Sequence, residues 1–366
     1  MEKIAVLGAG NGGCALAAHL SLQGHMVNLF EAPELAESFE PLAQKKEIVI
    51  SGKAENSIAK LNKATTDIAD AVKGVDTVFI SVPAFGYARM SQLLVPFLVP
   101  GQLVVFLPGS FATFILLGEM KQQKTRPDIT IAEGATLPYA ARLKERNHVE
   151  IEGTTFVLPV GVFPATRSEP VIKKLQTYYP EIIGCGNVLD SALNNLNPMT
   201  HPAPMLLSTS FIEGKEGFYL YRDGITDGVK RVMIASDRER IALRKALSLP
   251  EPHYGYHQFT PFEVFEDFFG KGCLVETGYQ LKGPASMTNR FITEDVPYGL
   301  VLFSILGKKL GVKTAVIDSI VELAGTVNDE DYWEIGTNLW KKYIGRWNLD
   351  KLKKFLVSGA RESITK

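Results

Sequence analysis

Residues 3–20 read KIAVLGAGNGGCALAAHL, and this stretch decides the fold of the first half of the chain. An apolar run leads into the pattern G-x-G-x-x-G, whose glycines are Gly8, Gly10 and Gly13, and an Ala- and Leu-rich helical run follows. A strand, a glycine-rich turn and a helix in this order predict a dinucleotide-binding βαβ unit.

Each glycine of the pattern has a physical task. Gly8 allows the tight turn, Gly10 leaves space for a pyrophosphate, and Gly13 lets the helix pack closely on the strand. The helix N-terminus offers unpaired N–H groups and the positive dipole end to the phosphates. The alternative is a glycine-rich turn in an ordinary βα unit, which the flanking segments disfavour. The expected cofactor-binding residues of this turn are Gly8, Gly10, Asn11 and Gly13.

Glu31 closes the next apolar run, residues 26–30, and bears on which cofactor binds. A carboxylate here accepts hydrogen bonds from the adenosine ribose hydroxyls of NAD, whereas the 2′-phosphate of NADP would meet a like charge. No Arg stands near Glu31 in the sequence, and the first Lys pair, Lys45 and Lys46, lies well downstream. NAD is therefore favoured over NADP. The alternative is that Glu31 is a solvated acid at a strand end.

The bulk composition is that of an ordinary globular protein. The chain has 366 residues, of which 46% are hydrophobic and 22% charged, and a formal net charge of −1. The length predicts two domains. The near-zero charge gives no general attraction to nucleic acid or to an anionic membrane, so small-molecule substrates are the expected partners. The oligomeric state stays open, with a homodimer among the assemblies that the sequence allows.

The cysteines and the uncharged segments bear on the compartment. Cys14, Cys185 and Cys273 are far apart, which favours free thiols over a disulfide framework or a zinc site. Residues 90–118 carry no charge, but prolines and glycines divide them into pieces shorter than a membrane span. A strand begins at the N-terminus, so no signal peptide is expected. We expect a soluble, cytoplasmic protein.

Strand-like and helical patterns alternate through the first half, with predicted strands at residues 4–7, 26–30, 77–82, 103–107, 129–132 and 155–158. Continuous apolar runs between helices predict a doubly wound parallel sheet, the α/β architecture of a Rossmann domain. After about residue 184, amphipathic patterns predict helices at 225–247, 260–269, 298–310, 314–324 and 333–343. We expect a Rossmann domain over 1–185 and a mostly α-helical substrate domain over 186–366, with the catalytic groups between them.

Two loops of the first domain are candidates for the nicotinamide half of the cofactor. Pro83 and Ala84 follow the strand at 77–82, and Pro108 closes the next strand in a similar way. Both loops lie at the carboxyl edge of the sheet, where a dinucleotide binds. Structural turns would look the same, so both interpretations stay open for Pro83 and Ala84.

His201 is flanked by prolines at the start of a predicted helix. Pro202 suits a first helical turn, which places His201 near the cap. The helix end lowers the pKa of such a histidine and a nearby carboxylate raises it, and a balance near neutrality suits proton transfer. A buried structural histidine is the alternative, and the motif alone favours it.

Arg290 and Asp295 lie close together in the sequence and form another group of candidate functional residues. Arg290 can bind a substrate carboxylate through two parallel hydrogen bonds, and Asp295 can orient a histidine. The alternative is a loop in which Asp295 pairs with Arg290, and composition alone favours it. His253 and His257 have no third clustered ligand, so a metal site is not expected there. His19, within the first helix, is expected to serve packing.

Together these motifs resemble the opine dehydrogenases, the octopine/nopaline dehydrogenase group, from end to end. The matching segments are the glycine pattern and residues 82–85 (VPAF), 136–142 (TLPYAAR), 201–205 (HPAPM) and 290–300 (RFITEDVPYGL). The last two are much more specific than the glycine pattern, which many dehydrogenases share.

The resemblance implies an NAD(P)-dependent oxidoreductase acting on the CH–NH group of donors. Such an enzyme condenses a 2-oxo acid, for example pyruvate, with the amino group of an amino acid, reduces the imine, and runs the reverse oxidation. The resemblance makes His201 the acid/base residue, Asp295 its partner and Arg290 the anchor of a substrate carboxylate. One departure is the segment 108–113, PGSFAT, where relatives often carry an Arg and paired Gly. Substrate preference can therefore differ.

Two other functions remain open on the sequence alone. One is an NAD-dependent dehydrogenase of a simple hydroxy acid or sugar phosphate, which predicts reduction of an oxo acid without any amine. The other is a non-catalytic NAD-sensing module, which predicts NADH binding without oxidation. The sequence does not identify the amino acid or the 2-oxo acid.

Overall fold

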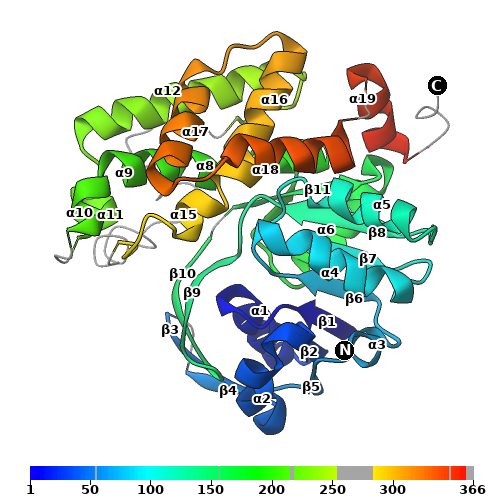
Figure 1. Cartoon of the computed structure of the whole chain (residues 1–366). Helices are drawn as coiled ribbons and strands as arrows, with labels where there is room; N and C mark the ends of the chain where they lie inside the picture. Colours follow the sequence, from blue (N-terminus) through cyan, green and yellow to red (C-terminus); the bar gives the residue numbers. More distant parts are fainter. Residues whose placement is uncertain (54–55, 156, 215–217, 254–282, 346–347, 360–366) are drawn as a thin grey trace. The chain divides into compact units, whose positions relative to one another are not determined.

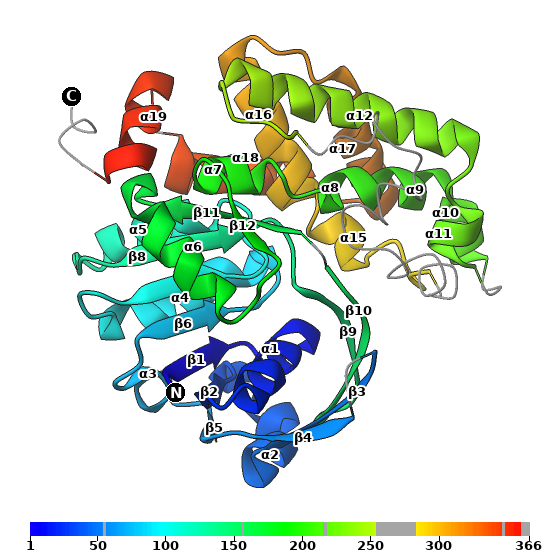
Figure 2. The ribbon, with the colours of Figure 1, turned by 180° about the vertical axis from the view of Figure 1, so that it is seen from behind.

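The computed structural model describes residues 1–53, 56–155, 157–214, 218–253, 283–345 and 348–359 (Figures 1 and 2). The chain divides into two compact units. Unit 1 comprises Met1–Ala192 and Asn348–Lys366, and unit 2 comprises Leu193–Trp347.

Unit 1 is built on an eight-stranded sheet with the order β12-β11-β8-β7-β6-β1-β2-β5. The strands from β8 to β5 are mutually parallel, and the central ones are buried on both faces, as helices on both sides of a parallel sheet require. This confirms the predicted Rossmann architecture. The bounds are β1 Lys3–Leu7, β2 Met26–Phe30, β5 Lys63–Thr65, β6 Thr77–Ile80, β7 Leu103–Phe106, β8 Thr130–Gly134, β11 Leu158–Phe163 and β12 Ile182–Gly184.

The last predicted strand, at 155–158, is wrong. Strand β11 starts only at Leu158, and it runs antiparallel to β8 while β12 runs parallel to it. Pro159 and Gly161 lie inside β11, and such residues argue against a strand when only the sequence is read. Gly161 is needed here because a Cβ at that position would overlap the carbonyl oxygen of Asn187.

A second sheet, missed by the sequence analysis, covers helix α1 (Asn11–Leu22). The pair β9–β10 curves around α1, which lies between the two sheets (Figures 1 and 2). The second sheet has the order β4-β3-β10-β9, with bounds β3 Glu47–Gly52, β4 Ser57–Lys60, β9 Tyr139–Glu145 and β10 His148–Thr154. Enclosure on both sides explains why α1 is apolar over most of its surface.

The remaining helices of unit 1 cover the main sheet. They are α2 Ala36–Lys45, α3 Ile68–Val72, α4 Tyr87–Leu94, α5 Ala112–Gln122, α6 Ser168–Gln176, α7 Val188–Ala192 and α19 Leu349–Ser358. Two of them shift the expected domain boundary, which was placed after Cys185. Helix α7 stays with unit 1, where the Ser191 hydroxyl donates to the carbonyl of Glu133 at 2.6 Å. Helix α19 returns to unit 1, where Phe355 packs on Phe163 with ring centroids 4.8 Å apart.

Every described element of unit 2 is helical. The elements are α8 Asn197–Thr200, α9 Pro202–Leu207, α10 Thr209–Glu213, α11 Leu220–Asp223, α12 Asp227–Ala246, α15 Arg290–Thr293, α16 Val301–Leu310, α17 Ala315–Asn328 and α18 Tyr332–Leu339, with π-helical turns at Val296–Leu300 and Trp340–Ile344. The helices predicted at 225–247, 298–310, 314–324 and 333–343 are confirmed to within a few residues. The helix predicted at 260–269 lies outside the described residues.

A buried charged cluster on α12 organises the start of unit 2. Arg240 and Asp237 are fully buried and form an ion pair at 2.7 Å. The same guanidinium donates to the carbonyl of Leu193, the first residue of the unit, at 2.6 Å and to the carbonyl of His253 at 2.9 Å. Buried charges must be paired and hydrogen-bonded. The cluster therefore holds α12, the start of the unit and the segment at His253 in contact with one another.

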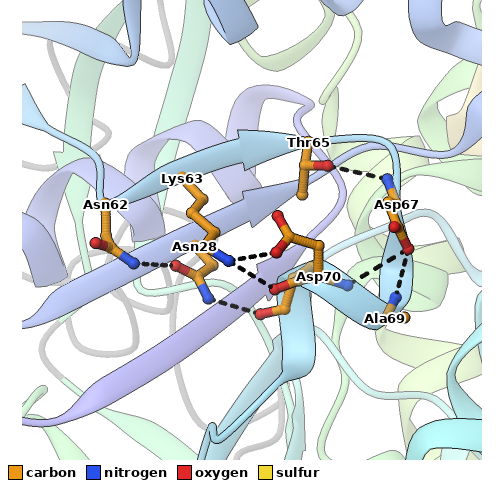
Figure 3. Close-up of polar contacts among 8 residues, drawn as sticks. Asn28, Asn62, Lys63, Thr65, Asp67, Ala69 and Asp70 are labelled. Atoms are coloured by element: carbon orange, nitrogen blue, oxygen red, sulfur yellow. Dashed lines mark hydrogen bonds and ion pairs between the residues drawn. The ribbon is translucent and has the colours of Figure 1, made fainter.

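A polar network anchors the far edge of the main sheet (Figure 3). Asn28 on β2 is buried, and its amide donates to the carbonyl of Ala71 at 2.7 Å while its oxygen accepts from Asn62 at 2.7 Å. Beside it, Lys63 of β5 pairs with Asp70 of α3. The network therefore joins β2, β5 and α3 at the edge of the sheet.

We expect Asn28→Ala to lower the free energy of unfolding by about 2 kcal/mol, because it leaves buried polar partners without hydrogen bonds. Thr65→Val is the matched control. It removes only the exposed bond from the Asp67 N–H, and should change the free energy by less than about 0.5 kcal/mol. Urea unfolding followed by circular dichroism measures both. Equal effects of the two substitutions would show that the buried hydrogen bonds of Asn28 contribute no more to the free energy of unfolding than an exposed one.

Candidate functional site

The glycine-rich turn has the geometry that the sequence predicts. Gly8 has φ +102°, and a Cβ there would lie 2.6 Å from the Ser81 carbonyl oxygen of the neighbouring β6 turn. A Cβ on Gly13 would overlap the carbonyl oxygen of Gly8, so only glycine lets α1 start this close to β1. At Gly10 nothing lies within 4 Å of the position that a Cβ would take, so its backbone borders open space. The turn thus leaves room for a phosphate at the start of α1.

The Glu31 carboxylate is buried, with 8% of the residue exposed. One oxygen accepts from the N–H of Ala9, within the glycine turn, at 2.9 Å, and the other accepts from the N–H of Ala32 at 2.8 Å. Glu31 is therefore no solvated acid. It joins the end of β2 to the glycine turn, and each oxygen keeps a second lone pair that can accept from a ribose hydroxyl.

Asn11 and Leu137 connect the second sheet and the segment before it to the N-terminus of α1, beside the glycine-rich turn. The side-chain oxygen of Asn11, in the first turn of α1, accepts from the N–H of Leu143 on β9 at 2.9 Å. A Cβ on Gly12 would lie 2.9 Å from a methyl carbon of Leu137. The segment that precedes and begins β9 therefore packs on the N-terminus of α1. Sequence reasoning quoted this segment but gave Leu137 no role, because contact between residues so far apart leaves no local pattern.

The two candidate nicotinamide loops are joined to each other. Pro83 precedes a 3₁₀ turn, Ala84–Gly86, in which Ala84 is buried. Tyr87, at the start of α4, donates its hydroxyl to the carbonyl of Pro108 at 2.8 Å, and the Gly109 N–H donates to the carbonyl of Gly134 at 2.7 Å. All these turns lie at the carboxyl edge of the sheet around β1, where the strand order reverses and dinucleotides bind.

Glu133, at the end of β8, is a titratable residue that the sequence analysis missed. It is fully buried, and its carboxylate accepts from the Thr113 N–H at the start of α5 at 2.6 Å. A Cβ on Gly109 would lie 2.6 Å from the Cβ of Glu133. Glu133 therefore supports the loop 108–113. Burial raises the pKa of Glu133 to about 7, against hydrogen bonds from Thr113 and the helix start that lower it.

In unit 2, His201 and Asp295 form a close pair. Nδ1 of His201 lies 2.7 Å from Oδ2 of Asp295, and their side chains are only 12% and 10% exposed. The imidazole also stacks on Phe291, with ring centroids 3.7 Å apart and an interplanar angle of 8°. Because Nδ1 donates to the carboxylate, the neutral ring presents Nε2 as an acceptor.

Local structure explains how the pair is placed. His201 is the N-cap of α9 and Pro202 occupies its first turn, as the sequence predicts. Asp295 follows the short helix α15 by two residues and is the N-cap of the π-helical turn Val296–Leu300, whose Leu300 N–H donates to the Asp295 carbonyl at 3.0 Å. π-Helical turns recur at functional sites.

Arg290 does not pair with Asp295, contrary to the alternative that composition favoured. Its guanidinium lies 3.8 Å from the carboxylate of Glu294, which is longer than a hydrogen bond, and its side chain is 49% exposed. Arg290 starts α15, whose N-cap Asn289 accepts from the Phe291 N–H at 3.1 Å. The same helix therefore carries Arg290 and the ring that stacks on His201.

Two of the other histidines, His253 and His19, have packing or hydrogen-bond contacts away from this pair. His253 Nδ1 accepts from Arg244 at 3.2 Å, while His257 lies outside the described residues. His19 stacks on Tyr179, which confirms its packing role. Cys14 and Cys185 are thiols outside any disulfide, and Cys273 lies outside the described residues. Within the described ranges, no cluster of three potential metal ligands is found, and no helix is long and apolar enough to cross a membrane.

Fold and site together define a two-unit oxidoreductase with an N-terminal NAD-binding Rossmann domain. Residues 3–129 match the family model described as the NAD-dependent glycerol-3-phosphate dehydrogenase N-terminus. Residues 184–328 match the model described as the NAD/NADP octopine/nopaline dehydrogenase, alpha-helical domain. The chain is thus similar to the opine dehydrogenases in its second half, as its motifs indicated.

Similarity to opine dehydrogenases also extends over nearly the whole chain in individual relatives and solved structures. The opine dehydrogenase of Arthrobacter sp. (strain 1C) is 29% identical over 93% of this chain and 94% of that protein. The octopine dehydrogenase of Mizuhopecten yessoensis is 22% identical over 88% and 89%. A structure of octopine dehydrogenase with NADH and L-arginine has a TM-score of 0.76 at 21% identity, covering 99% of each chain. The fold class is thereby confirmed.

The buried Glu133 gives a pH-dependent prediction. Its pKa is raised in the folded state from an ordinary 4.5 to about 7, so ionisation opposes folding, and its unfavourable contribution grows as pH rises from 4.5 to 7. Glu133→Gln removes this titration but keeps an oxygen for the Thr113 N–H. The unfolding free energy of the variant minus that of the wild type should rise by about 2.5 kcal/mol between pH 5 and pH 8.

Urea unfolding at pH 5, 6, 7 and 8 measures this difference. Glu169→Gln, at an exposed position on α6, is the control. Its difference from the wild type should stay constant over this range, because folding leaves this side chain in water and so hardly changes its surroundings. A constant difference for Glu133→Gln as well would show that this carboxyl does not titrate near neutrality.

Proposed function

We propose that this enzyme is an NADH-dependent opine dehydrogenase. An amino acid and a 2-oxo acid such as pyruvate lose water to form an imine, which NADH and a proton reduce to a secondary amine with release of NAD. The reverse reaction oxidises the amine. The observation that carries the proposal is the 2.7 Å His201–Asp295 pair in the helical unit of a chain whose first unit has a dinucleotide-binding turn.

The residues of unit 1 fit a bound NAD. The open space at Gly10 and the two acceptor oxygens of Glu31 match a pyrophosphate and a ribose. We assign the pyrophosphate to the turn and the ribose to Glu31, with the loop after β6 beside the nicotinamide. When bound, NADH supplies the hydride that reduces the imine. The assigned residues are Gly8, Gly10, Asn11, Gly13, Glu31, Pro83 and Ala84.

His201 moves the protons of the reaction. Its Nε2 receives a proton as the amine attacks the carbonyl carbon and returns one as water leaves, which is general acid–base catalysis. Asp295, bonded to Nδ1, holds the ring and stabilises its protonated form. The carboxylate is nearly buried, so its attraction to the imidazolium is little weakened by water.

Arg290 anchors the substrate carboxylate. Every 2-oxo acid carries a carboxylate next to the reacting carbonyl, and a guanidinium binds it through two parallel hydrogen bonds. The exposed guanidinium, held only at 3.8 Å from Glu294, is placed to take such a partner. Fixing the oxo acid in this way orders the two substrates for reaction.

The cellular location and the oligomeric state of the enzyme are a separate part of the proposal. We infer a reducing, cytoplasmic location, which the thiols of Cys14 and Cys185 support. A homodimer is the assembly to be tested, by light scattering from the purified chain.

The function is tested by following NADH oxidation with amino acids paired with pyruvate or 2-oxoglutarate, and by mass spectrometry of the product. The proposal expects oxidation only when both substrates are present, and a product whose mass is that of the secondary amine. Oxidation without an amine would instead indicate a hydroxy-acid dehydrogenase. NADH binding without oxidation for any pair would indicate an NAD-sensing module.

His201→Ala should lower kcat by about 10² to 10⁴, because it removes the proton-transferring group. Its Kd for NADH, measured by nucleotide fluorescence, should equal that of the wild type. Asp295→Asn should also lower kcat, by about 10- to 100-fold, because it alters the tautomer and the orientation of the ring. Near-normal turnover of His201→Ala would exclude the assigned role.

Arg290→Ala should raise KM for the 2-oxo acid about 10- to 100-fold, the loss expected for a charge-assisted hydrogen-bond pair. KM for NADH should stay unchanged. Arg290→Lys should recover only part of the loss, since it restores the charge without the planar fork. Arg222→Ala removes an exposed guanidinium elsewhere on unit 2 and is the control. An unchanged KM in Arg290→Ala would argue against the anchor.

A further inference from the structure

The structure brings an arginine to the end of β2, although none is near Glu31 in the sequence. Arg89, on α4, donates from Nε to Oε1 of Glu34 at 2.5 Å. Glu34 lies in the 3₁₀ turn Pro33–Leu35, which begins two residues after Glu31. Both partners remain accessible, with 50% and 52% of their side chains exposed.

The sheet order explains this approach. Strands β2 and β6 flank β1, so the turns that follow them lie on opposite sides of the glycine turn at the carboxyl edge. The Arg89–Glu34 pair bridges these two turns. Glu34 follows Glu31, the carboxylate assigned to the adenosine ribose, by three residues, in the turn that leads away from the end of β2. A 2′-phosphate on that ribose would project beside the guanidinium.

We propose that Glu34 withholds Arg89 from a 2′-phosphate, and that this ion pair acts together with Glu31 to set the preference for NADH over NADPH. Arg89 has the planar donor fork that binds phosphate. While Glu34 occupies that fork, a 2′-phosphate is repelled by the carboxylates of Glu31 and Glu34. The positive charge of Arg89 is then already compensated and attracts the phosphate less. The inference rests on the proposed cofactor site, but it concerns binding and not the opine reaction.

An exposed ion pair contributes little to folding, so it can be removed without unfolding the chain. We therefore test Glu34→Gln, which keeps the size of the side chain and frees Arg89 from its charge partner. The Kd for NADPH should fall about tenfold, the change expected when one charge-assisted hydrogen bond to phosphate is gained. The Kd for NADH should change less than about twofold, because NADH has no phosphate there.

Two further variants identify the cause. Glu34→Gln combined with Arg89→Ala should lose the gain for NADPH, since the gain requires the guanidinium. Glu37→Gln removes the same charge one turn further along, in the first turn of α2, and is the matched control. It should leave the ratio of the two Kd values within about twofold of the wild type, because an exposed charge further away is largely screened.

Direct titration of each purified variant with NADH and NADPH, followed by nucleotide fluorescence, gives all the Kd values without any turnover. Three results would overturn the proposal: an unchanged ratio in Glu34→Gln, a gain that persists without Arg89, or an equal gain in Glu37→Gln. Failure of the cofactor site itself looks different, because the wild type would then bind neither nucleotide. Absence of opine activity would leave the titrations unaffected.

Discussion

The close approach of α1 to β1 is the constraint on which the cofactor half of the structure depends. A side chain at Gly13 would overlap the carbonyl oxygen of Gly8, so the helix can begin at this distance only with glycine. Starting so close, α1 points its first N–H groups at the carboxyl edge of the sheet. Its outer face is then covered by the second sheet, which Asn11 holds through the N–H of Leu143. The space proposed for the phosphates at the start of α1 therefore depends on one close backbone contact.

Two buried carboxylates give the loops around this turn their positions. Glu31 accepts from main-chain N–H groups of Ala9 and Ala32, and Glu133 accepts from that of Thr113. Neither is held by a cation in these bonds, so main-chain dipoles stabilise the charge. For Glu31 this leaves lone pairs for a ligand, whereas for Glu133 burial dominates and raises the pKa. The same chemical group therefore has the proposed role of ribose recognition at Glu31 and supports a loop at Glu133.

Features that depend on neighbouring residues could be predicted from the sequence, whereas features that depend on pairing between distant segments were missed. The strand–turn–helix start and the capping position of His201 are set by neighbouring residues, and the structure has them as expected. The second sheet needs β3 to pair with β10, far along the chain, and β11 carries a proline and a glycine that conceal it. Composition favoured a pair between Asp295 and Arg290, but the π-helical turn directs Asp295 to His201. Arg89 was missed for the same reason, since strand order alone brings it to Glu34.

The contacts of His201 show which part of the ring remains for chemistry. Asp295 occupies Nδ1, and Phe291 covers a face of the ring with nearly parallel planes. A stacked ring with one nitrogen fixed cannot rotate without losing both contacts, so the direction of Nε2 is set before any substrate arrives. Because Phe291 follows Arg290 on α15, the helix that fixes the imidazole also carries the guanidinium. A displacement of α15 would disturb the imidazole and move the guanidinium, so in the proposed mechanism binding of the oxo acid is tied to the geometry of proton transfer.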